Sequence, residues 1–350
     1  MKFGLHFQLP QSPHQSDVAL YRDSLDQAAH AETLGFESVW PVEQHFNAAF
    51  SLLPSPLLWL AALAERTHTM RLGIGIILLP LSHPVRVAEE IATLDVLSNG
   101  RVEFGIGRGV FPSHFAGFGI DQAQSRERLL EGLEIILKAW TEERFSFHGK
   151  FFNVEDLCVV PKPIQQPHPP VRVASNTVET FKLMGELGYP ILSASQVNTF
   201  PKLRELIPLY YQARQAAGHT EADAETLSLL SPVYVGETAD QVRSESEPSM
   251  SRFIQSLLEA FPAINNDGSE KNKLLQEAAD RLRHTTYTQV CDTMAIYETP
   301  EVCVERLQQL QEEFSVGRMI CWFNAGGLIP HENVMRSMEL FANKVIPHFV

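Results

Sequence analysis

Eight short runs rich in β-forming residues alternate with amphipathic helical stretches along the 350 residues of this chain. Parallel strands need a crossover connection, which is usually a helix, so this alternation predicts repeated βα units. Eight such units close a β/α barrel, which often exceeds about 250 residues as one domain. We therefore predict a single α/β domain over residues 1–350, a (β/α)8 or TIM barrel. The expected strands begin near Lys2, Ser38, Arg71, Val102, Val171, Pro190, Leu227 and Arg318.

Two stretches break the alternation. Residues 145–170 are rich in proline and aromatic residues and too long for a tight connection, so we expect an excursion before the fifth strand. Residues from about 236 to 299 form a longer insertion after the seventh strand, in which helical pieces flank the polar segment 262–268. A long insertion near the loop face of a barrel can be a lid or a surface excursion, and the residues fit both interpretations.

The charge and cysteine content limit the expected partners. The chain has 42 Asp and Glu against 28 Lys and Arg, a net charge of -14, and no basic patch suited to nucleic acid or an anionic membrane. Four cysteines (Cys158, Cys291, Cys303 and Cys321) lack metal-ligand spacing, which is typical of free thiols in a reducing compartment. No segment has the pattern of a secretion signal or a membrane span. We expect a cytoplasmic protein without metal, nucleic-acid or membrane partners.

The expected end of the second strand carries three hydrogen-bonding side chains in a row, Glu43, Gln44 and His45. Active sites of β/α barrels lie at the carboxyl ends of the strands, so these residues are candidates for catalysis. An imidazole or a carboxyl group can exchange protons near neutral pH, whereas an amide cannot. A lone histidine in such a place can equally be a structural residue.

Two arginines are candidates for binding a phosphate. Arg108 lies between Gly107 and Gly109 after the fourth strand, where small neighbours let an anion approach the backbone. Arg126 follows Ser125 near the start of a long helix, where the helix dipole adds to its charge. The alternatives are a structural ion pair for Arg108 and a solvated surface charge for Arg126.

Two other strands carry residues that suit a ligand. The fifth strand leads into a helix start with several hydrogen-bonding groups, among them Asn176, Thr177 and Thr180. Such a start can bind an anion or simply cap the helix. The third strand contains Gly73 and Gly75 within a buried run, which suggests that a flat ligand or a strained peptide lies close. Close packing within the sheet explains these glycines as well.

Short motifs spread over most of the predicted βα units carry a family resemblance. They are Lys2-Phe3-Gly4, Val39-Trp40, Glu43-Gln44-His45-Phe46, His83-Pro84-Val85-Arg86, Phe104-Gly105-Ile106, Arg108-Gly109, Ser125-Arg126, Asn198-Thr199 and Thr299-Pro300-Glu301. Together they resemble the bacterial luciferase-like flavin monooxygenases, over residues 1–199 and again from residue 299 to the C-terminus.

The resemblance implies a (β/α)8 barrel that binds reduced FMN delivered by a separate flavin reductase and uses it with molecular oxygen. A non-prolyl cis peptide of the family would fall at Gly75-Ile76, beneath the flavin ring. The implied substrate is a small hydrophobic molecule, such as an aldehyde, a ketone or a biosynthetic intermediate. The flavin phosphate of the light-emitting subunit is held by residues that match Arg108, Val110, Arg126, Asn176, Thr177 and Thr180 here, with Asn176 in place of a Glu.

Two departures from the light-emitting subunit change the expected chemistry. Its catalytic His matches Gln44 here, while the adjacent His is kept as His45. Proton handling must then pass to His45, to Glu43 or to water, and Gln44 would orient the substrate or the oxygen species. The reactive Cys of that subunit matches Gly107, which we expect to open space near the ring. These changes argue against light emission and leave oxygenation possible.

Two other functions remain open. One is a non-catalytic flavin-binding partner subunit, since the β subunit of luciferase has Asn at the position of Gln44; the presence of Arg108 and Arg126 argues against it. The other is an oxidoreductase that uses the deazaflavin F420, which the wider superfamily supports. We also expect a homodimer, because the apolar stretch 54–63 could supply a patch for association, although a core-facing helix would explain most of its residues.

Overall fold

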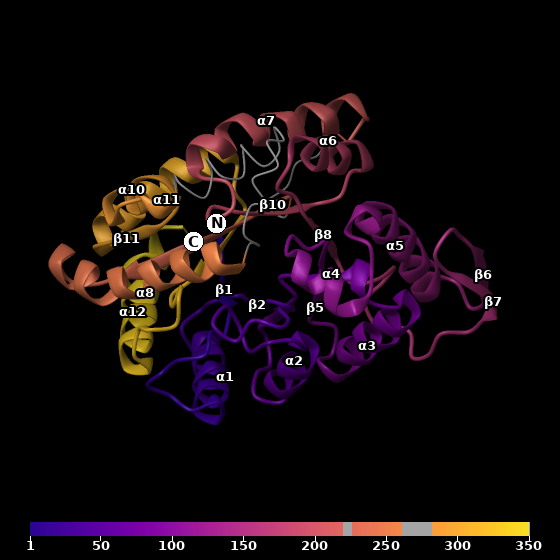
Figure 1. Cartoon of the computed structure of the whole chain (residues 1–350), viewed down its shortest axis with the longest axis horizontal. Helices are drawn as coiled ribbons and strands as arrows, with labels where there is room; N and C mark the ends of the chain where they lie inside the picture. Colours follow the sequence, from indigo (N-terminus) through magenta and orange to yellow (C-terminus); the bar gives the residue numbers. More distant parts are fainter. Residues whose placement is uncertain (220–225, 261–281, 350) are drawn as a thin grey trace.

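The computed structural model describes residues 1–219, 226–260 and 282–349. In this part of the chain, eight parallel strand positions close into a barrel surrounded by helices, which confirms the predicted fold (Figure 1). Each barrel strand begins within one residue of its predicted start. The barrel consists of β1 (Lys2–Phe7), β2 (Ser38–Pro41), β3 (Arg71–Gly73) with β4 (Ile77–Leu78), β5 (Val102–Gly107), β8 (Val171–Ala174), β9 (Ile191–Ala194), β10 (Leu227–Val235) and β12 (Arg318–Trp322).

The first and last strands close the barrel. β1 pairs with β2 on one side and with β12 on the other, and β10 joins β9 to β12. Along β1, Phe3, Leu5 and Phe7 are buried in the apolar core that lies between the barrel and the helices. A Cβ at Gly4 would meet the side chains of Ser38 and Trp40 inside the barrel. The two faces of β1 therefore alternate as period-two geometry requires.

Helices follow the strands and cover the outside of the barrel (Figure 1). Proline occupies a first-turn position of α2, α3 and α11, where its fixed φ suits a helix start. The helices are α1 (Asp17–Thr33), α2 (Pro56–Ala64), α3 (Pro84–Leu97), α4 (Pro112–Phe118), α5 (Ser125–Thr141), α6 (Val178–Leu187), α7 (Phe200–Ala216), α8 (Ala239–Ala260), α10 (Tyr287–Thr293), α11 (Pro300–Phe314) and α12 (His331–Lys344), with 3-10 turns η1 (Leu79–Leu81), η2 (Gln122–Gln124) and η3 (Ile346–His348).

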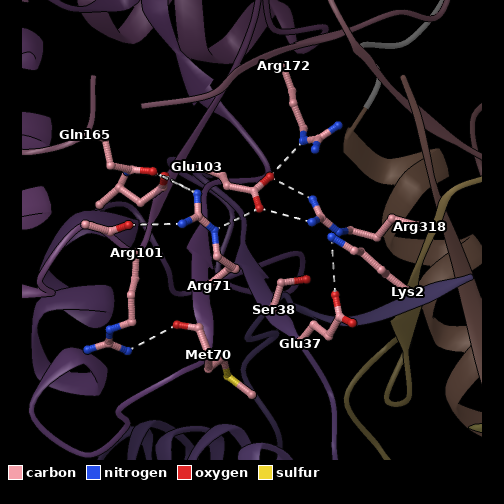
Figure 2. A network of polar contacts seen from close by, with 12 residues as sticks. Lys2, Glu37, Ser38, Met70, Arg71, Arg101, Glu103, Gln165, Arg172 and Arg318 are labelled. Carbon is pink, nitrogen blue, oxygen red and sulfur yellow. Dashed lines mark hydrogen bonds and ion pairs between the residues drawn. The ribbon is translucent and has the colours of Figure 1, made fainter. Parts of the chain in front are cut away.

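A buried ion network fills the amino-terminal end of the barrel (Figure 2). The Glu103 carboxylate accepts hydrogen bonds from Arg318 (2.7 and 3.1 Å), Arg172 (2.8 Å) and Arg71 (3.2 Å). Burial would raise the pKa of Glu103, but the charges of Arg318 and Arg172 lower it to about 2. This end of the barrel is therefore packed and charged, which leaves the carboxyl ends of the strands to hold a ligand.

The two predicted breaks in the alternation contain regular structure. The excursion 145–170 holds an antiparallel hairpin, β6 (Phe145–His148) with β7 (Asn153–Leu157), which projects beside α5 (Figure 1). The insertion after β10 begins with α8 and ends with α10 and β11 (Ile296–Glu298), which pairs in parallel with the end of β10. The polar segment 262–268 lies outside the described residues.

The apolar stretch 54–63 belongs largely to α2. Trp59, Leu60 and Leu63 are buried in the core, whereas Leu58 is 74% exposed. Most of this stretch therefore faces the core. This agrees with the interpretation of the stretch as a core-facing helix, which was the alternative to a patch for association. Among the described residues, no helix combines the length and the apolar character needed to cross a membrane.

Candidate active site

A cavity of about 1080 Å³ lies at the carboxyl ends of the barrel strands. Gln44 follows β2, Ile76 precedes β4 and Asn176 follows β8, and all three line the cavity. Lys202 of α7 and Gln289 of α10 line it as well, so the insertion contributes to its wall. This volume is at the upper end of the range for small-molecule sites, roughly 300–1,000 Å³, so the cavity can hold a cofactor together with a substrate.

The bottom of this cavity is apolar. One buried cluster, called here the apolar floor, consists of Trp40, Leu192, Leu230 and Ile320. The Trp40 indole donates from Nε1 to Ser38 Oγ (3.0 Å), and the Arg318 guanidinium lies 5.4 Å from its ring centroid. The apolar floor therefore lies between the cavity and the buried charges of the ion network.

The two glycines of the third strand have different roles. A Cβ at Gly73 would lie 2.4 Å from the Trp40 indole, so this glycine makes room for the apolar floor. For Gly73 the packing interpretation is right and the expected ligand contact is wrong. Gly75 is joined to Ile76 by a cis peptide bond, as predicted, and both residues line the cavity.

The prediction of open space at Gly107 is wrong. A Cβ at this position would come within 2.0 Å of the Ile76 Cδ1 atom. The Ile76 side chain thus fills the volume that the missing Gly107 side chain leaves, and Gly107 is not among the residues that line the cavity.

The three candidate catalytic residues after β2 lie in different places. Gln44 lines the cavity, whereas Glu43 and His45 do not appear in its wall. Glu43 is buried, and its carboxylate accepts a hydrogen bond from the Leu78 backbone N–H (2.7 Å) and contacts His45 Nε2 (2.9 Å). The His45 backbone N–H donates to Nε2 of His114 (3.3 Å). Glu43 and His45 therefore hold the segment that presents Gln44 to the cavity.

Arg108 and Arg126, called here the cationic cluster, lie close enough for their charges to interact. Burial, followed by the charge of Arg126, lowers the pKa of Arg108, and the charge of Glu179 opposes this effect. Arg126 pairs with the Glu179 carboxylate. Among the described residues, no hydrogen bond or ion pair is made by Arg108. The structure thus brings together the two arginines that the sequence singled out and adds a carboxylate beside them.

The start of α6 lies beside the cationic cluster, since Glu179 in its first turn pairs with Arg126. Thr177 is the N-cap residue, and its hydroxyl accepts a hydrogen bond from the Thr180 backbone N–H (3.2 Å). Asn176 lines the cavity, and so does Val110. The predicted cofactor residues therefore fall into two groups. Val110 and Asn176 face the cavity together with Gly75 and Ile76, whereas Arg108, Arg126, Thr177 and Thr180 lie outside its lining.

Several polar residues of the cavity wall were not singled out by any sequence pattern, among them His6 and Gln196. His6 of β1 is buried, and its Nδ1 has no hydrogen-bond partner among the described residues; the same is true of Gln196 Oε1. Burial lowers the pKa of His6 to about 4, against a smaller opposing contribution from the Trp40 backbone. The alternation along β1 could have identified His6, because it shares the inward face with Gly4 and alternates with the apolar residues.

The part of the cavity wall formed by described residues carries no negative charge. No Asp or Glu is among the described residues that line it, although the whole chain has a net charge of -14. Its ionisable groups are His6, Lys202 and His284. An uncharged or anionic ligand is therefore favoured over a cationic one.

Comparison with known proteins identifies the family. Residues 1–315 match the model of the luciferase-like monooxygenases. The alkanal monooxygenase alpha chain of the Kryptophanaron alfredi symbiont is 28% identical, with 99% of this chain and 98% of that protein covered. The monooxygenase RslO1 from Streptomyces bottropensis superimposes with a TM-score of 0.84 at 26% identity, with 100% of both chains covered.

A further solved structure shares the fold. The oxygenating constituent of 3,6-diketocamphane monooxygenase from Pseudomonas putida, solved in complex with FMN, gives a TM-score of 0.82 at 22% identity, with 100% of this chain and 99% of that chain covered. The family match extends over most of the chain and includes all the barrel strands except β12, which begins three residues beyond it. The chain is therefore a flavin-dependent oxidoreductase that belongs to the luciferase-like monooxygenase family.

Proposed function

We propose that this protein is a monooxygenase that uses reduced FMN and molecular oxygen to oxygenate a small hydrophobic substrate, such as an aldehyde, a ketone or a biosynthetic intermediate. One oxygen atom enters the substrate and the other leaves as water, with two electrons from the reduced flavin and two protons. The observation that carries the proposal is a large cavity with an apolar floor, no acidic lining among the described residues, and a cationic cluster close to its β8 side.

The residues present fit FMN as the cofactor. The guanidinium groups of Arg108 and Arg126, near the start of α6, suit a phosphate, which prefers charge-assisted hydrogen bonds and helix N-termini. Thr177 and Thr180 would add hydroxyl groups, and Val110 and Asn176 would line the path between phosphate and ring. The flavin ring would lie at Gly75 and Ile76. When bound, reduced FMN supplies the electrons that activate oxygen.

The side chains of the cavity would position the substrate and exclude water. The apolar floor and Ile76 give the cavity an apolar bottom, which favours a hydrophobic substrate and keeps water from a reactive oxygen species. Gln44 would orient the substrate through its amide. We propose that Glu43 and His45 contribute by holding Gln44 in place, because their own side chains pair with each other.

Two partners belong to this proposal. A separate flavin reductase would supply the reduced FMN, and the protein would act as a homodimer. Size-exclusion chromatography with light scattering measures the mass in solution; a mass of one chain, 39.3 kDa, would contradict the dimer.

The insertion after β10 would act as a lid over the cavity, since its Gln289 and Thr293 line the cavity.

An F420-dependent oxidoreductase is the alternative, because structures that share the fold include an F420-dependent secondary alcohol dehydrogenase (TM-score 0.77, 18% identity). One experiment separates the two. The protein is titrated with FMN and with F420, and then supplied with reduced FMN, oxygen-18 gas and candidate aldehydes or ketones. The proposal expects FMN binding and one labelled oxygen atom in the product. Binding of F420 alone, or oxygen consumption that yields only hydrogen peroxide with every substrate, would contradict it.

A further inference from the structure

The loop between β8 and α6 is tied to the neighbouring strand β9. The two strands pair in parallel, and the Ser175 backbone N–H extends this pairing with a hydrogen bond to the Leu192 carbonyl (2.9 Å). The Ser193 hydroxyl donates to the Ser175 carbonyl (3.3 Å). Beyond Ser175 the chain leaves the sheet to enter α6. Among the described residues, no backbone N–H donates to the next carbonyl, that of Asn176.

A side chain from the turn after β9 supplies the partner for this carbonyl. The Nδ2 atom of Asn198 donates a hydrogen bond to the Asn176 carbonyl (3.1 Å). The backbone N–H of Asn198 donates to the Ala194 carbonyl (2.9 Å), which closes the turn and fixes the point from which the side chain extends. Asn198 is 8% exposed and lines the cavity. Its amide therefore holds the β8–α6 loop at the wall of the cavity.

The carbonyl that Asn198 holds belongs to the peptide that leads into α6. The Asn176-Thr177 peptide is trans, so its N–H points away from its carbonyl and the two directions are fixed together. Thr177 is the N-cap residue of α6, and the first N–H groups of a helix have no partner within the helix. Fixing this peptide therefore fixes the direction of the N–H groups at the start of α6, where the proposed function places the phosphate.

The loop has little else to hold this peptide in place. The Asn176 side chain does not anchor it, because its Oδ1 atom makes no hydrogen bond among the described residues. The Thr177 hydroxyl is occupied within the helix start, where it accepts from the Thr180 backbone N–H (3.2 Å). The contact from Asn198 is therefore the side-chain restraint that links this peptide to the barrel.

We propose that Asn198 is a positioning residue for the cofactor phosphate, which holds the Asn176 carbonyl and so aims the start of α6 at the phosphate. This inference rests on the proposed function, because it names what keeps the phosphate site in place. Asn198 acts through the Asn176-Thr177 peptide and does not itself contact the phosphate. The assignment also gives a role to the Asn198-Thr199 motif, which the proposed chemistry has not used.

The quantity that tests this role is the selectivity for FMN over riboflavin, which is the ratio of their dissociation constants. Fluorescence titration of the full-length protein with the oxidised flavins measures both constants. Riboflavin has the same ring and ribityl chain and lacks only the phosphate, so a general loosening of the cavity affects both ligands alike. The selectivity therefore responds to the phosphate site and not to the stability of the fold.

Asn198→Leu keeps the branched shape of the side chain and removes the N–H donor. We expect it to lower the selectivity about fivefold, the effect of one net hydrogen bond, and to leave riboflavin affinity within about twofold. If Asn198→Leu does not fold, Asn198→Ala carries the same expectation. Thermal melting of each variant shows whether it is folded at the temperature of the titration.

Asn324→Leu is the matched control. The Asn324 Nδ2 atom also donates to a loop carbonyl, that of Ile329 (3.0 Å), but Asn324 does not line the cavity. This variant removes the same kind of contact from the loop after β12. It should lower the melting temperature and leave the selectivity for FMN over riboflavin unchanged.

Two results would overturn the assignment alone. One is an unchanged selectivity in a folded Asn198→Leu or Asn198→Ala variant, whether the two affinities stay the same or fall together. The other is a loss of selectivity in Asn324→Leu equal to that in Asn198→Leu. A failure of the proposed phosphate site has a different signature, because wild-type protein would then bind FMN and riboflavin with equal affinity and both proposals would be wrong.

Discussion

The carboxylate of Glu179 is the residue-scale feature that most affects the proposed phosphate site. Glu179 lies in the first turn of α6 and pairs with Arg126, so an incoming phosphate must compete with it. Both side chains are largely exposed, and exposed ion pairs are weak. We expect Glu179→Gln to tighten FMN binding by about two- to fivefold. The variant removes a carboxylate that competes weakly with the phosphate for Arg126, and it removes a negative charge that repels the phosphate. Titration monitored by flavin fluorescence measures this change.

The matched control for that variant is Glu186→Gln, which removes the same charge from the opposite end of α6. It should leave FMN affinity nearly unchanged. Riboflavin lacks the phosphate, so its affinity should not respond to Glu179→Gln. A gain in riboflavin binding equal to the gain in FMN binding would show that Glu179 acts on the ring or on the whole fold and not on the phosphate.

Glu43 provides a second residue-scale prediction, which concerns stability. Its buried carboxylate accepts a hydrogen bond from the Leu78 N–H and contacts His45. Glu43→Ala leaves that N–H without a partner, so we expect a loss of about 2–3 kcal/mol in the free energy of unfolding. Glu43→Gln keeps an acceptor and should lose less. Urea denaturation measures both values, and an equal loss in the two variants would contradict the role of the Leu78 contact.

At the scale of elements, the third strand and Trp40 are packed as one unit. A Cβ at Gly73 would overlap the indole, so Gly73→Ala should destabilise the protein by about 1–3 kcal/mol through overpacking. Trp40→Phe makes room and should recover part of this loss in the double variant, because the two positions share one volume. Additive losses in the double-mutant cycle would contradict direct packing between them.

The ion network at the ends of β3, β5, β8 and β12 gives an element-scale prediction about pH. The folded protein lowers the pKa of Glu103 from its ordinary 4.5 to about 2, so folding favours the charged carboxylate. The stabilisation of the folded protein that comes from the charged Glu103 is complete above about pH 4.5 and is lost as the pH falls toward 2. A shift of this size corresponds to about 3 kcal/mol in the free energy of unfolding.

Glu103→Gln isolates this contribution. The variant cannot carry the charge, so it should be less stable than wild type at pH 7 by about 3–5 kcal/mol, as expected when one partner of a buried ion pair is removed. The difference between the two proteins should shrink as the pH falls from 4.5 toward 2. Denaturation curves over this range measure it, and a difference that stays constant with pH would rule out titration of Glu103 as its source.

The elements themselves could be predicted from the sequence, but several contacts between them could not. Hydrophobic runs and helix-start prolines are local signals, so the strand starts were predicted within one residue. The roles of Gly73 and Gly107 depend on Trp40 and Ile76, which lie on other strands or segments. Local sequence pattern does not report which side chain fills the volume beside a glycine, and both expectations of a ligand or open space there were wrong.

At the scale of the whole molecule, family resemblance and the periodicity of the sequence predicted the barrel. Because the barrel is closed, the carboxyl ends of its strands surround one cavity. Gln44, Gly75, Ile76, Val110 and Asn176 line it, and their roles toward a substrate or a cofactor stay predictions. The orientation of His45 toward Glu43 could not be predicted, because adjacent residues after a strand can point in opposite directions. His6 was missed because the candidates were sought after the strands, whereas it lies within β1.

The central claim is that the cationic cluster binds the phosphate of FMN at the mouth of this cavity. The most direct test compares the dissociation constants of reduced FMN and reduced riboflavin for the wild-type protein and for Arg108→Ala, under anaerobic conditions. A charge-assisted contact to phosphate contributes about 1.5–3 kcal/mol, so we expect Arg108→Ala to weaken FMN binding by roughly 10- to 100-fold and to leave riboflavin binding within about twofold. Equal losses for FMN and riboflavin, or no loss for FMN, would contradict the account.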